Sequence, residues 1–320
     1  MLNLSGIKAK CVIFVRTGIG LLHLNPLLSG MISIIICSIN PNLVKALEKN
    51  VESTIGVPYE FMAYDNRNTG KGICAVYNEC ALKAKYDILF FIHEDVLFHT
   101  QGWGKILAEK LAEPDCGAVG FAGGTAKLPY SYGWQSIKCF TRKNYIKGAQ
   151  GGRKASLRSS GSKAAYDAVV TLDGMAICVR RDVWSKIRFD EDTFKGFHSY
   201  DTDFTTATFV AGYKNYVCNA MLFEHLSQGS FSRTWFESVK LYLDKWQKVL
   251  PLYIKEEYSA SQISGKSKKV EAFAILQLIK NRIVPVEEAE KMVEKYRKEN
   301  GLCCNVLKMY CKMRKYRKTK

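Results

Sequence analysis

Short apolar runs alternate with helical patterns between residues 31 and 121, and this alternation constrains the fold more than any other feature of the chain. The strand-like runs are 31–37, 59–64, 86–92 and 116–121, and the helical patterns are 42–55, 73–85 and 102–113. Asn42 could cap the first of these helices. Strands that alternate with helices predict an α/β fold, in which helices cover both faces of a mainly parallel sheet.

The third apolar run ends in His93-Glu94-Asp95. In an open α/β sheet, ligands bind at the carboxyl ends of the strands. A carboxylate at that edge can hold a hard divalent cation, and the cation can hold a diphosphate. An acidic loop that caps the next helix is the alternative, and three residues alone do not separate the two interpretations.

Beyond residue 121 the pattern becomes irregular before strands return. Residues 123–167 read as a long loop, rich in Gly, Ser and Lys over 148–163, and such a loop is either functional or disordered. Strand character returns over 169–179, broken by Asp173-Gly174. A short helix from Tyr200 to about Gly212, a strand over 213–218 and a helix over 233–250 are predicted after it.

The two ends of the chain differ from this central part. Residues 1–30 are predicted to be an extension outside the core, too interrupted by Arg16 and Pro26 for a transmembrane helix. Residues 31–250 are expected to form the main domain and 251–320 a helical C-terminal region. Within that region 259–269 is linker-like, and two helices flank Pro285.

The charge balance favours anionic partners. Lys and Arg number 47 against 30 Asp and Glu, which gives a net charge of +17. Such a charge favours polyanions, anionic membranes or phosphorylated substrates. Nucleic acid is not expected, because the chain has no RNA- or DNA-binding motif and its basic residues concentrate at the end. The eleven cysteines include no CxxC pair, so we expect a reducing, cytoplasmic location rather than a zinc site or a disulfide framework.

The last thirteen residues contain seven Lys or Arg and no acid. If this tail is helical, one side would carry Val306, Leu307, Tyr310, Met313 and Arg317. Such a segment can lie on an anionic membrane surface, which predicts peripheral contact with the inner face of the membrane. A solvated, disordered basic end is the alternative.

Several short motifs, each present once, follow one another along the chain. They are Ser38-Ile39-Asn40, Asp65-Asn66, Tyr77-Asn78-Glu79, His93-Glu94-Asp95, Asp173-Gly174, Gly196-Phe197-His198-Ser199-Tyr200-Asp201-Thr202-Asp203 and His225-Leu226-Ser227-Gln228-Gly229-Ser230. In this order, residues 31–235 resemble a family 2 glycosyltransferase with the GT-A fold, a Rossmann-like fold. The similarity is greatest to a bacterial subgroup that carries the phrase "gFH-YD-D".

The resemblance implies a nucleotide-sugar donor and a divalent metal. Its nucleotide pocket would be lined by Ser38, Asn40, Asp65, Asn66, Asn78 and Glu94, although turn roles stay open for Ser38, Asn40 and Asp65. Asp95 would be the principal ligand of Mn²⁺ or Mg²⁺, and His225 would approach the metal or the diphosphate through a loop that includes Ser227 and Gly229. His93 stands where many members have Asp; imidazole tolerates Mn²⁺ better than Mg²⁺, but His93 could also lie outside the ligand shell.

The resemblance also implies an inverting transfer, which needs a general base because an acceptor hydroxyl does not ionise near neutral pH. Asp201 aligns with that base, and Asp203 is the second candidate. Either carboxylate could instead cap the helix that follows. Asp173 and Gly174 would border the donor or acceptor sugar, and His198 would lie in the acceptor site or the core.

The expected activity is transfer of a sugar, with a UDP-sugar as donor, to a glycan or a lipid-linked acceptor during cell-surface polysaccharide synthesis. A GT-A-like domain that binds nucleotide or glycan without catalysis is one alternative. A sugar-nucleotide nucleotidyltransferase is another, disfavoured because no Gly-rich, Arg-containing phosphate loop follows the first strand.

Overall fold

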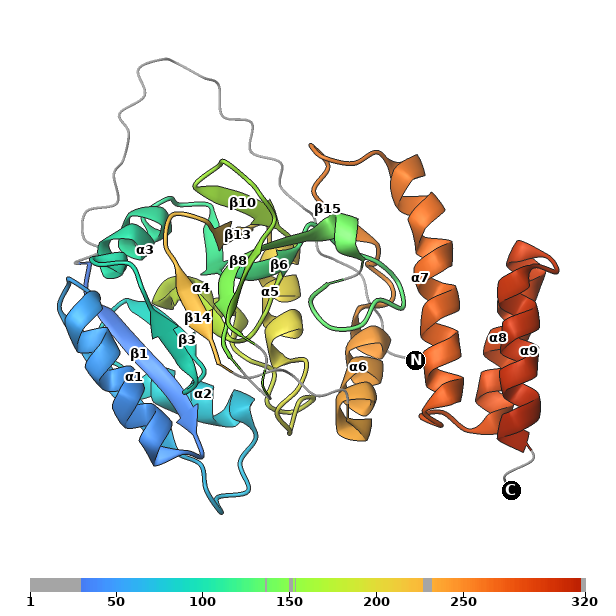
Figure 1. The fold of residues 1–320 in the computed structure, drawn as a ribbon, viewed down its shortest axis with the longest axis horizontal. Helices are drawn as coiled ribbons and strands as arrows, with labels where there is room; N and C mark the ends of the chain where they lie inside the picture. The colour runs from blue at the N-terminus through green and yellow to red at the C-terminus, as the bar shows by residue number, and fades with distance from the viewer. Residues whose placement is uncertain (1–29, 136, 150–151, 153, 227–231, 318–320) are drawn as a thin grey trace, which may run out of the picture.

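The computed structural model of the chain describes residues 30–135, 137–149, 152, 154–226 and 232–317. The predicted N-terminal extension lies outside this part except for Gly30. A central seven-stranded sheet has the order β10-β13-β5-β12-β3-β1-β2 (Figure 1). Its strands are β1 (Ile32–Ser38), β2 (Tyr59–Asp65), β3 (Ile88–Ile92), β5 (Cys116–Gly120), β10 (Tyr166–Val169), β12 (Ala176–Arg180) and β13 (Lys214–Cys218).

The predicted α/β architecture is confirmed, and the central sheet is mixed in direction. β1 pairs in parallel with β2 and β3, and β13 pairs in parallel with β5. β12 runs antiparallel to both β3 and β5, and β10 runs antiparallel to β13. The carboxyl ends of β1, β2 and β3 therefore meet at one edge, as the sequence predicted.

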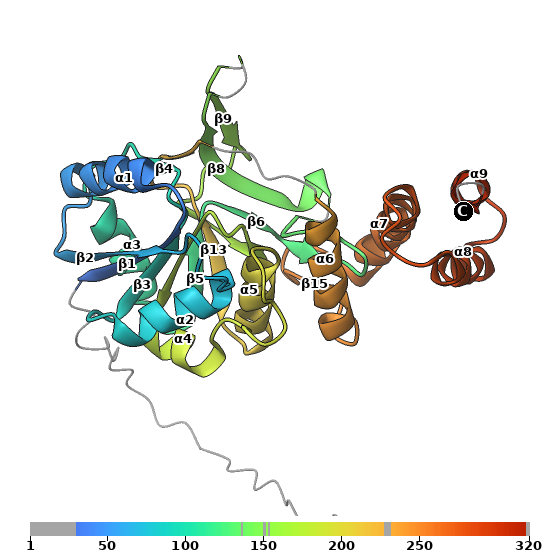
Figure 2. The same cartoon turned by 90° about the horizontal axis from the view of Figure 1, so that it is seen from below.

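Helices cover both faces of this sheet because the strands are apolar on both sides. In β1, Ile34 and Ile36 face α1 (Pro41–Thr54) and α3 (Trp103–Leu111), whereas Ile35 faces the opposite cluster. That opposite cluster includes residues of α2 (Ile73–Lys83), α4 (Arg181–Ile187) and α5 (Tyr200–Val210). Figure 2 shows α1 on one side of the sheet and α2 and α4 on the other. Each large apolar side chain buried in these layers contributes about 1.5–3 kcal/mol to folding.

A second sheet contains several strands from residues 123–167, for which the sequence predicts a long loop. Its order is β11-β6-β8-β14-β4, with β9 paired to β8. The strands are β4 (Val96–Phe98), β6 (Ala122–Gly124), β8 (Thr141–Lys147), β9 (Ser156–Ser159), β11 (Thr171–Leu172) and β14 (Phe223–His225). The prediction of an irregular 123–167 is therefore wrong for the strands, chiefly β8 and β9, because β8 has a polar, basic sequence and is defined by pairing with distant strands.

The C-terminal part is helical from Ser259 onward. α6 (Arg233–Trp246) packs on the central domain, and β15 (Leu252–Tyr253) pairs with β7 (Ala126–Lys127) after it. The predicted linker at 259–269 is instead the start of α7 (Ala260–Lys280), which Ser259 and Gln262 begin with a reciprocal capping box. A short 3₁₀ helix, η1 (Lys138–Phe140), precedes β8.

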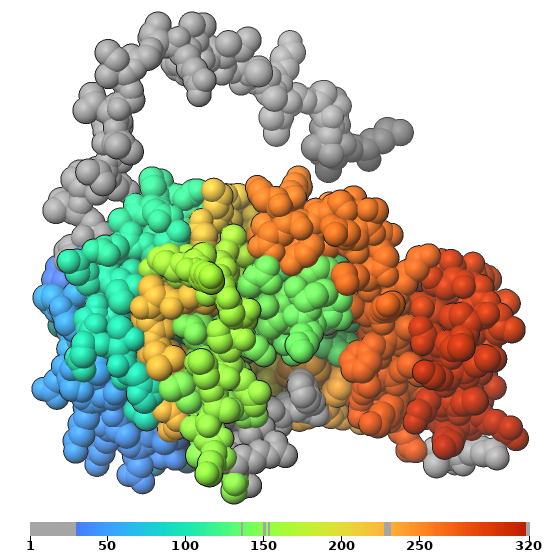
Figure 3. Space-filling view, turned by 45° about the horizontal axis from the view of Figure 1, so that its top comes forward, coloured from blue at the N-terminus to red at the C-terminus, as the bar shows by residue number. Residues whose placement is uncertain are grey.

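α7, α8 (Val286–Asn300) and α9 (Cys304–Arg317) pack together around their own apolar cluster and form one end of the molecule (Figures 1 and 3). The residues predicted to share one side of the tail helix differ in exposure. Val306 and Met313 are buried in this cluster, whereas Leu307 and Tyr310 are exposed. The apolar face of α9 is therefore used within the protein. Among the described residues, we find no helix with the length and apolar character needed to cross a membrane.

Candidate metal and catalytic site

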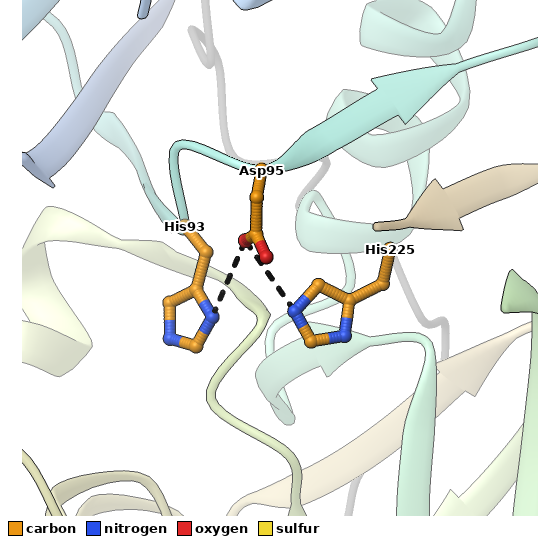
Figure 4. Close-up of side chains that lie close together, drawn as sticks. All are labelled: His93, Asp95 and His225. Atoms are coloured by element: carbon orange, nitrogen blue, oxygen red, sulfur yellow. Dashed lines mark ion pairs between the residues drawn. The ribbon is translucent and has the colours of Figure 1, made fainter. Parts of the chain in front are cut away.

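Three predicted metal ligands meet where the two sheets adjoin (Figure 4). His93 and Asp95 follow β3, and His225 ends β14, which pairs with β4 directly after Asp95. The Asp95 Oδ1 atom lies 3.4 Å from His225 Nε2 and 3.9 Å from His93 Nδ1. One donor atom from each residue can be chosen so that all three lie within 4.8 Å of one another.

The orientation of His93 is fixed by Tyr200. The Tyr200 hydroxyl donates its one hydrogen to the Gly174 carbonyl at 2.9 Å. It must therefore accept from His93 Nε2, which lies 2.9 Å away. The proton of a neutral His93 then sits on Nε2, and the lone pair of Nδ1 points toward Asp95. Histidines that bind metals are commonly held in this way by a hydrogen bond to the other ring nitrogen.

The charges of the site support a bound cation. Burial, followed by the charge of His225, lowers the pKa of His93 to about 4 against the opposing charge of Asp95, so His93 is neutral. Burial opposes protonation of His225, but the hydrogen bond and charge of Asp95, with the charge of Asp173, raise its pKa overall. The Nδ1 lone pair of a neutral His93, the Asp95 carboxylate and the His225 ring are donors of the kind that hold divalent transition metals. Two imidazoles and one carboxylate fit Mn²⁺ better than Mg²⁺, which prefers oxygen ligands.

Asp201 and Asp173 lie beside this cluster. Asp201 is in the first turn of α5, and its Oδ2 atom accepts a hydrogen bond from the Gly174 amide at 2.9 Å. Burial, followed by the charge of Asp173, raises the pKa of Asp201 to about 6, although backbone amides of its own turn act in the other direction. A side chain at position 174 would collide with the Tyr200 hydroxyl, so glycine is required there. The structure therefore brings together Asp173, Gly174 and Asp201, which the sequence had only placed in order.

Two residues of the site, Lys127 and Trp134, belong to no motif that the sequence analysis singled out. Lys127 is fully buried, and its Nζ atom donates to the carbonyls of Ser131 at 3.0 Å and Gly133 at 2.5 Å. Burial lowers the pKa of Lys127 to about 7, and the charge of Asp201 opposes this change. The loop that Lys127 holds leads to Trp134, whose side chain donates a hydrogen bond to Asp173. Burial raises the pKa of Asp173, and this hydrogen bond acts in the opposite direction. Only the tertiary fold brings this loop to the site.

Glu94 holds the loop between β1 and α1. Its Oε2 atom accepts hydrogen bonds from the Ser38 hydroxyl at 2.5 Å and from the amides of Ile39 and Asn40 at 3.1 and 2.9 Å. The Asn40 side chain accepts from the amides of Asn42 and Leu43, so Asn40, and not Asn42, caps α1. These contacts give Ser38, Asn40 and Glu94 a structural role at the predicted nucleotide edge.

The other predicted nucleotide residues are divided between surface and core. Asp65, exposed at the end of β2, pairs with Arg67 through two short contacts of 2.9 and 2.6 Å. Asn66 donates to the Lys71 carbonyl at 3.0 Å in the following turn. Asn78 lies in the core, where its amide exchanges two hydrogen bonds with the Phe189 backbone. Asn78 therefore holds a loop and does not face a ligand.

The remaining candidates lie away from His93, Asp95 and His225 or outside the described part of the chain. Asp203 is buried, and Lys245 and the Trp246 indole donate to its carboxylate at 2.9 and 2.7 Å. These bonds direct Asp203 toward α6 and leave Asp201 as the carboxylate near Gly174. His198 is half-buried, its pKa is lowered by burial, and its carbonyl accepts from Ser238. Ser227 and Gly229 lie outside the described residues.

Comparison with known proteins places these residues in a family. Residues 33–246 match the family described as "Glycosyltransferase like family". No curated protein sequence matches the chain. This match confirms the predicted class of enzyme, whereas the subgroup with the phrase "gFH-YD-D" stays a prediction.

Solved structures that resemble this fold include two glycosyltransferases, each of low sequence identity to this chain. One is GalNAc-T7 with UDP, GalNAc and Mn²⁺, at 9% identity and a TM-score of 0.47 over 83% of this chain. The chain covers only 55% of that protein, about half its length. Another is the mannosyltransferase PcManGT from Pyrobaculum calidifontis in complex with GDP-Man and Mn²⁺, at 11% identity and a TM-score of 0.44, covering 90% of this chain and 82% of that one. Because the family match spans 33–246 of the 320 residues, and so includes Asp95, Asp201 and His225, the chain belongs to the glycosyltransferase-like family.

Proposed function

We propose that the protein transfers a sugar from a nucleotide-sugar donor to an acceptor hydroxyl, with inversion at the anomeric carbon, and that it uses Mn²⁺ or Mg²⁺. The observation that carries this proposal is the trio of His93, Asp95 and His225, in which a neutral imidazole lone pair faces a carboxylate. These three residues would hold the cation. When bound, it neutralises the charge that develops on the departing diphosphate.

The donor nucleotide is proposed to lie over the carboxyl ends of β1 and β2. Ligands of open α/β sheets bind at this edge, and Ser38, Asn40, Asp65 and Asn66 lie there. Glu94 supports the pocket indirectly, because it holds the loop that carries Ser38 and Asn40. A UDP-sugar is the donor we propose to test first.

Asp201 is proposed as the general base. Its carboxylate would take the proton of the acceptor hydroxyl while the acceptor oxygen bonds to the anomeric carbon and the bond to the diphosphate breaks. A pKa near 6 suits a base that must be ionised at neutral pH and still accept a proton. Asp173, Gly174 and Trp134 would border the sugars, with the Gly174 amide fixing the Asp201 carboxylate.

A donor screen tests the proposal. Purified full-length protein is incubated with UDP- and GDP-sugars and Mn²⁺ or Mg²⁺, and released nucleotide is measured with and without a chelator. Metal-dependent release of nucleoside diphosphate is expected. Binding without release would favour the inactive, ligand-binding alternative, and release of pyrophosphate from a sugar phosphate and a nucleoside triphosphate would favour the nucleotidyltransferase.

A cytoplasmic location with peripheral membrane contact stays part of the proposal, together with a glycan or lipid-linked acceptor in cell-surface polysaccharide synthesis. The exposed basic residues of α9, such as Lys308, Lys312 and Lys315, support it. Each basic residue near an anionic surface adds about 1 kcal/mol of binding. Triple substitution of these lysines by Gln should abolish flotation with anionic liposomes and leave the buried cluster of α7–α9 intact. Unchanged flotation would remove α9 from the proposal.

A further inference from the structure

The hairpin of β8 and β9 presents one face toward the site. Successive residues of a strand alternate between faces, and paired residues of neighbouring strands share a face. Lys147 pairs with His225 and Tyr145 pairs with Arg158. Tyr145 and Arg158 therefore lie on the same face of this sheet as His225.

The opposite face of the hairpin is different in character. Asn144, Ile146 and Leu157 line a surface pocket there, and Arg142 forms an ion pair with Glu257 at 2.5 Å. Burial raises the pKa of Tyr145, and the charge of Asp173 raises it further. The charge of Arg158 lowers this pKa. The charges of both Asp173 and Arg158 act on Tyr145, and the face that Tyr145 shares with Lys143 is the face that carries His225.

Four cations gather along this face and its edge, and we call them the basic rim: Lys138, Lys143, Lys147 and Arg158. Lys143 and Arg158 are diagonal neighbours on one face of the β8–β9 pair, because Arg158 pairs with Tyr145. Burial lowers the pKa of Lys143, and the charges of Arg158 and Lys138 act in the same direction. Within the described part of the chain, no member of the basic rim forms an ion pair with a carboxylate. Like charges that gather without a counter-charge are unfavourable, and an anionic ligand would relieve them.

The position and length of the basic rim separate it from the donor site. Lys147 pairs with His225 of β14, and β8 lies on the opposite side of β14 from β4, away from β1 and β2, where the nucleotide is proposed (Figure 1). Lys143 and Lys147 are four residues apart on one strand, a span of roughly 13 Å. The space-filling view shows yellow-green residues of the hairpin on the molecular surface (Figure 3).

We propose that the basic rim binds an acceptor glycan that carries anionic groups, phosphate or carboxylate, and holds its end beside Asp201. This inference rests on the proposed transferase function and names its acceptor class. The bound anions neutralise the basic rim, and the length of the row favours a chain with repeated charges over a single small anion.

Polymer binding tests the inference without turnover. Full-length protein is titrated with polyphosphate, polygalacturonate and uncharged dextran of similar length at physiological salt. The Lys143→Ala/Arg158→Ala variant should bind the preferred charged polymer about tenfold or more weakly, since each cation near an anionic ligand adds about 1 kcal/mol. The matched control, Lys105→Ala/Lys295→Ala, removes two exposed lysines elsewhere and should change the affinity less than twofold.

Equal losses in both variants would overturn the inference, because general charge attraction would then explain binding. An unchanged affinity in the rim variant would also overturn it, as would rim-dependent binding of anionic vesicles with no binding of either charged polymer. The two charged polymers distinguish phosphate from carboxylate. Binding of UDP with Mn²⁺ is measured in parallel and should be the same in all variants; its absence in the wild type would count against the proposed function and leave the polymer result readable.

Discussion

Replacement of Asp201 by Asn should stabilise the protein while it abolishes transfer. Burial and the charge of Asp173 raise the pKa of Asp201 to about 6 from an ordinary value of 3.8. One pKa unit corresponds to about 1.4 kcal/mol, so the ionised carboxylate costs at most about 3 kcal/mol. Because the side chain is partly exposed, we take about 1–2 kcal/mol as the expected gain at pH 7.5.

The sign follows from linkage. A carboxylate whose folded pKa is raised adds stability below its unfolded pKa, and this stability is lost as the pH rises through 6. The neutral Asn avoids this loss and can still accept the Gly174 hydrogen bond. The gain in stability should therefore be present at pH 7.5 and absent at pH 4.

Thermal unfolding of wild type and variant at both pH values measures the effect. A gain on the order of 3 °C is expected at pH 7.5, together with a loss of transfer on the order of a hundredfold or more and unchanged donor binding. Asp244→Asn, on the exposed surface of α6, is the control and should alter neither property. A less stable Asp201→Asn protein at pH 7.5, or one that keeps its turnover, would refute the assignment of Asp201 as a general base with a raised pKa.

Four further outcomes are expected. Asp95→Asn should remove the thermal stabilisation given by a nucleoside diphosphate with Mn²⁺ and leave unfolding of the free protein near the wild-type value; retained stabilisation would show that Asp95 does not hold the metal. Asp203→Asn should keep turnover in the folded protein, because Lys245 and Trp246 hold this carboxylate away from the site; an inactive but folded protein would make Asp203 the base. The kcat/KM of the wild type should rise with pH through about 6 as Asp201 ionises, and a profile flat from pH 5 to 8 would contradict this role. Lys127→Met leaves the Ser131 and Gly133 carbonyls without their buried donor, which should cost about 1–3 kcal/mol and lower turnover more than donor affinity; equal loss of both would show that the loop to Trp134 serves the donor.

Local patterns were sufficient to predict the first half of the fold. The apolar run before His93 could only be a buried strand, and the helical patterns between the strands fixed the layers. The same reasoning failed for β8, whose residues Thr141–Lys147 are mostly polar and are held by pairing with β6, β9 and β14. It also missed the first turns of α7, where the capping box at Ser259 outweighs a polar composition.

The resemblance named candidate site residues but could not give their contacts. It grouped His93, Asp95 and His225 as candidate ligands, and the structure brings one donor atom from each within 4.8 Å of the others. No pattern in the sequence could show that Tyr200 orients His93, that Glu94 holds the loop at Ser38, or that Asn78 is buried against Phe189. These contacts join residues that are distant in the chain, and only the packing of the two sheets determines them.

The most direct test of the account is a Mn²⁺ titration followed by electron paramagnetic resonance, in which the signal of the free hydrated ion falls as it binds. In the presence of a nucleoside diphosphate, the wild-type protein should bind one Mn²⁺, and His93→Ala, Asp95→Asn and His225→Ala should each weaken that binding by about tenfold or more. Equal Mn²⁺ affinity in the wild type and all three variants would contradict the central claim that these residues hold the metal.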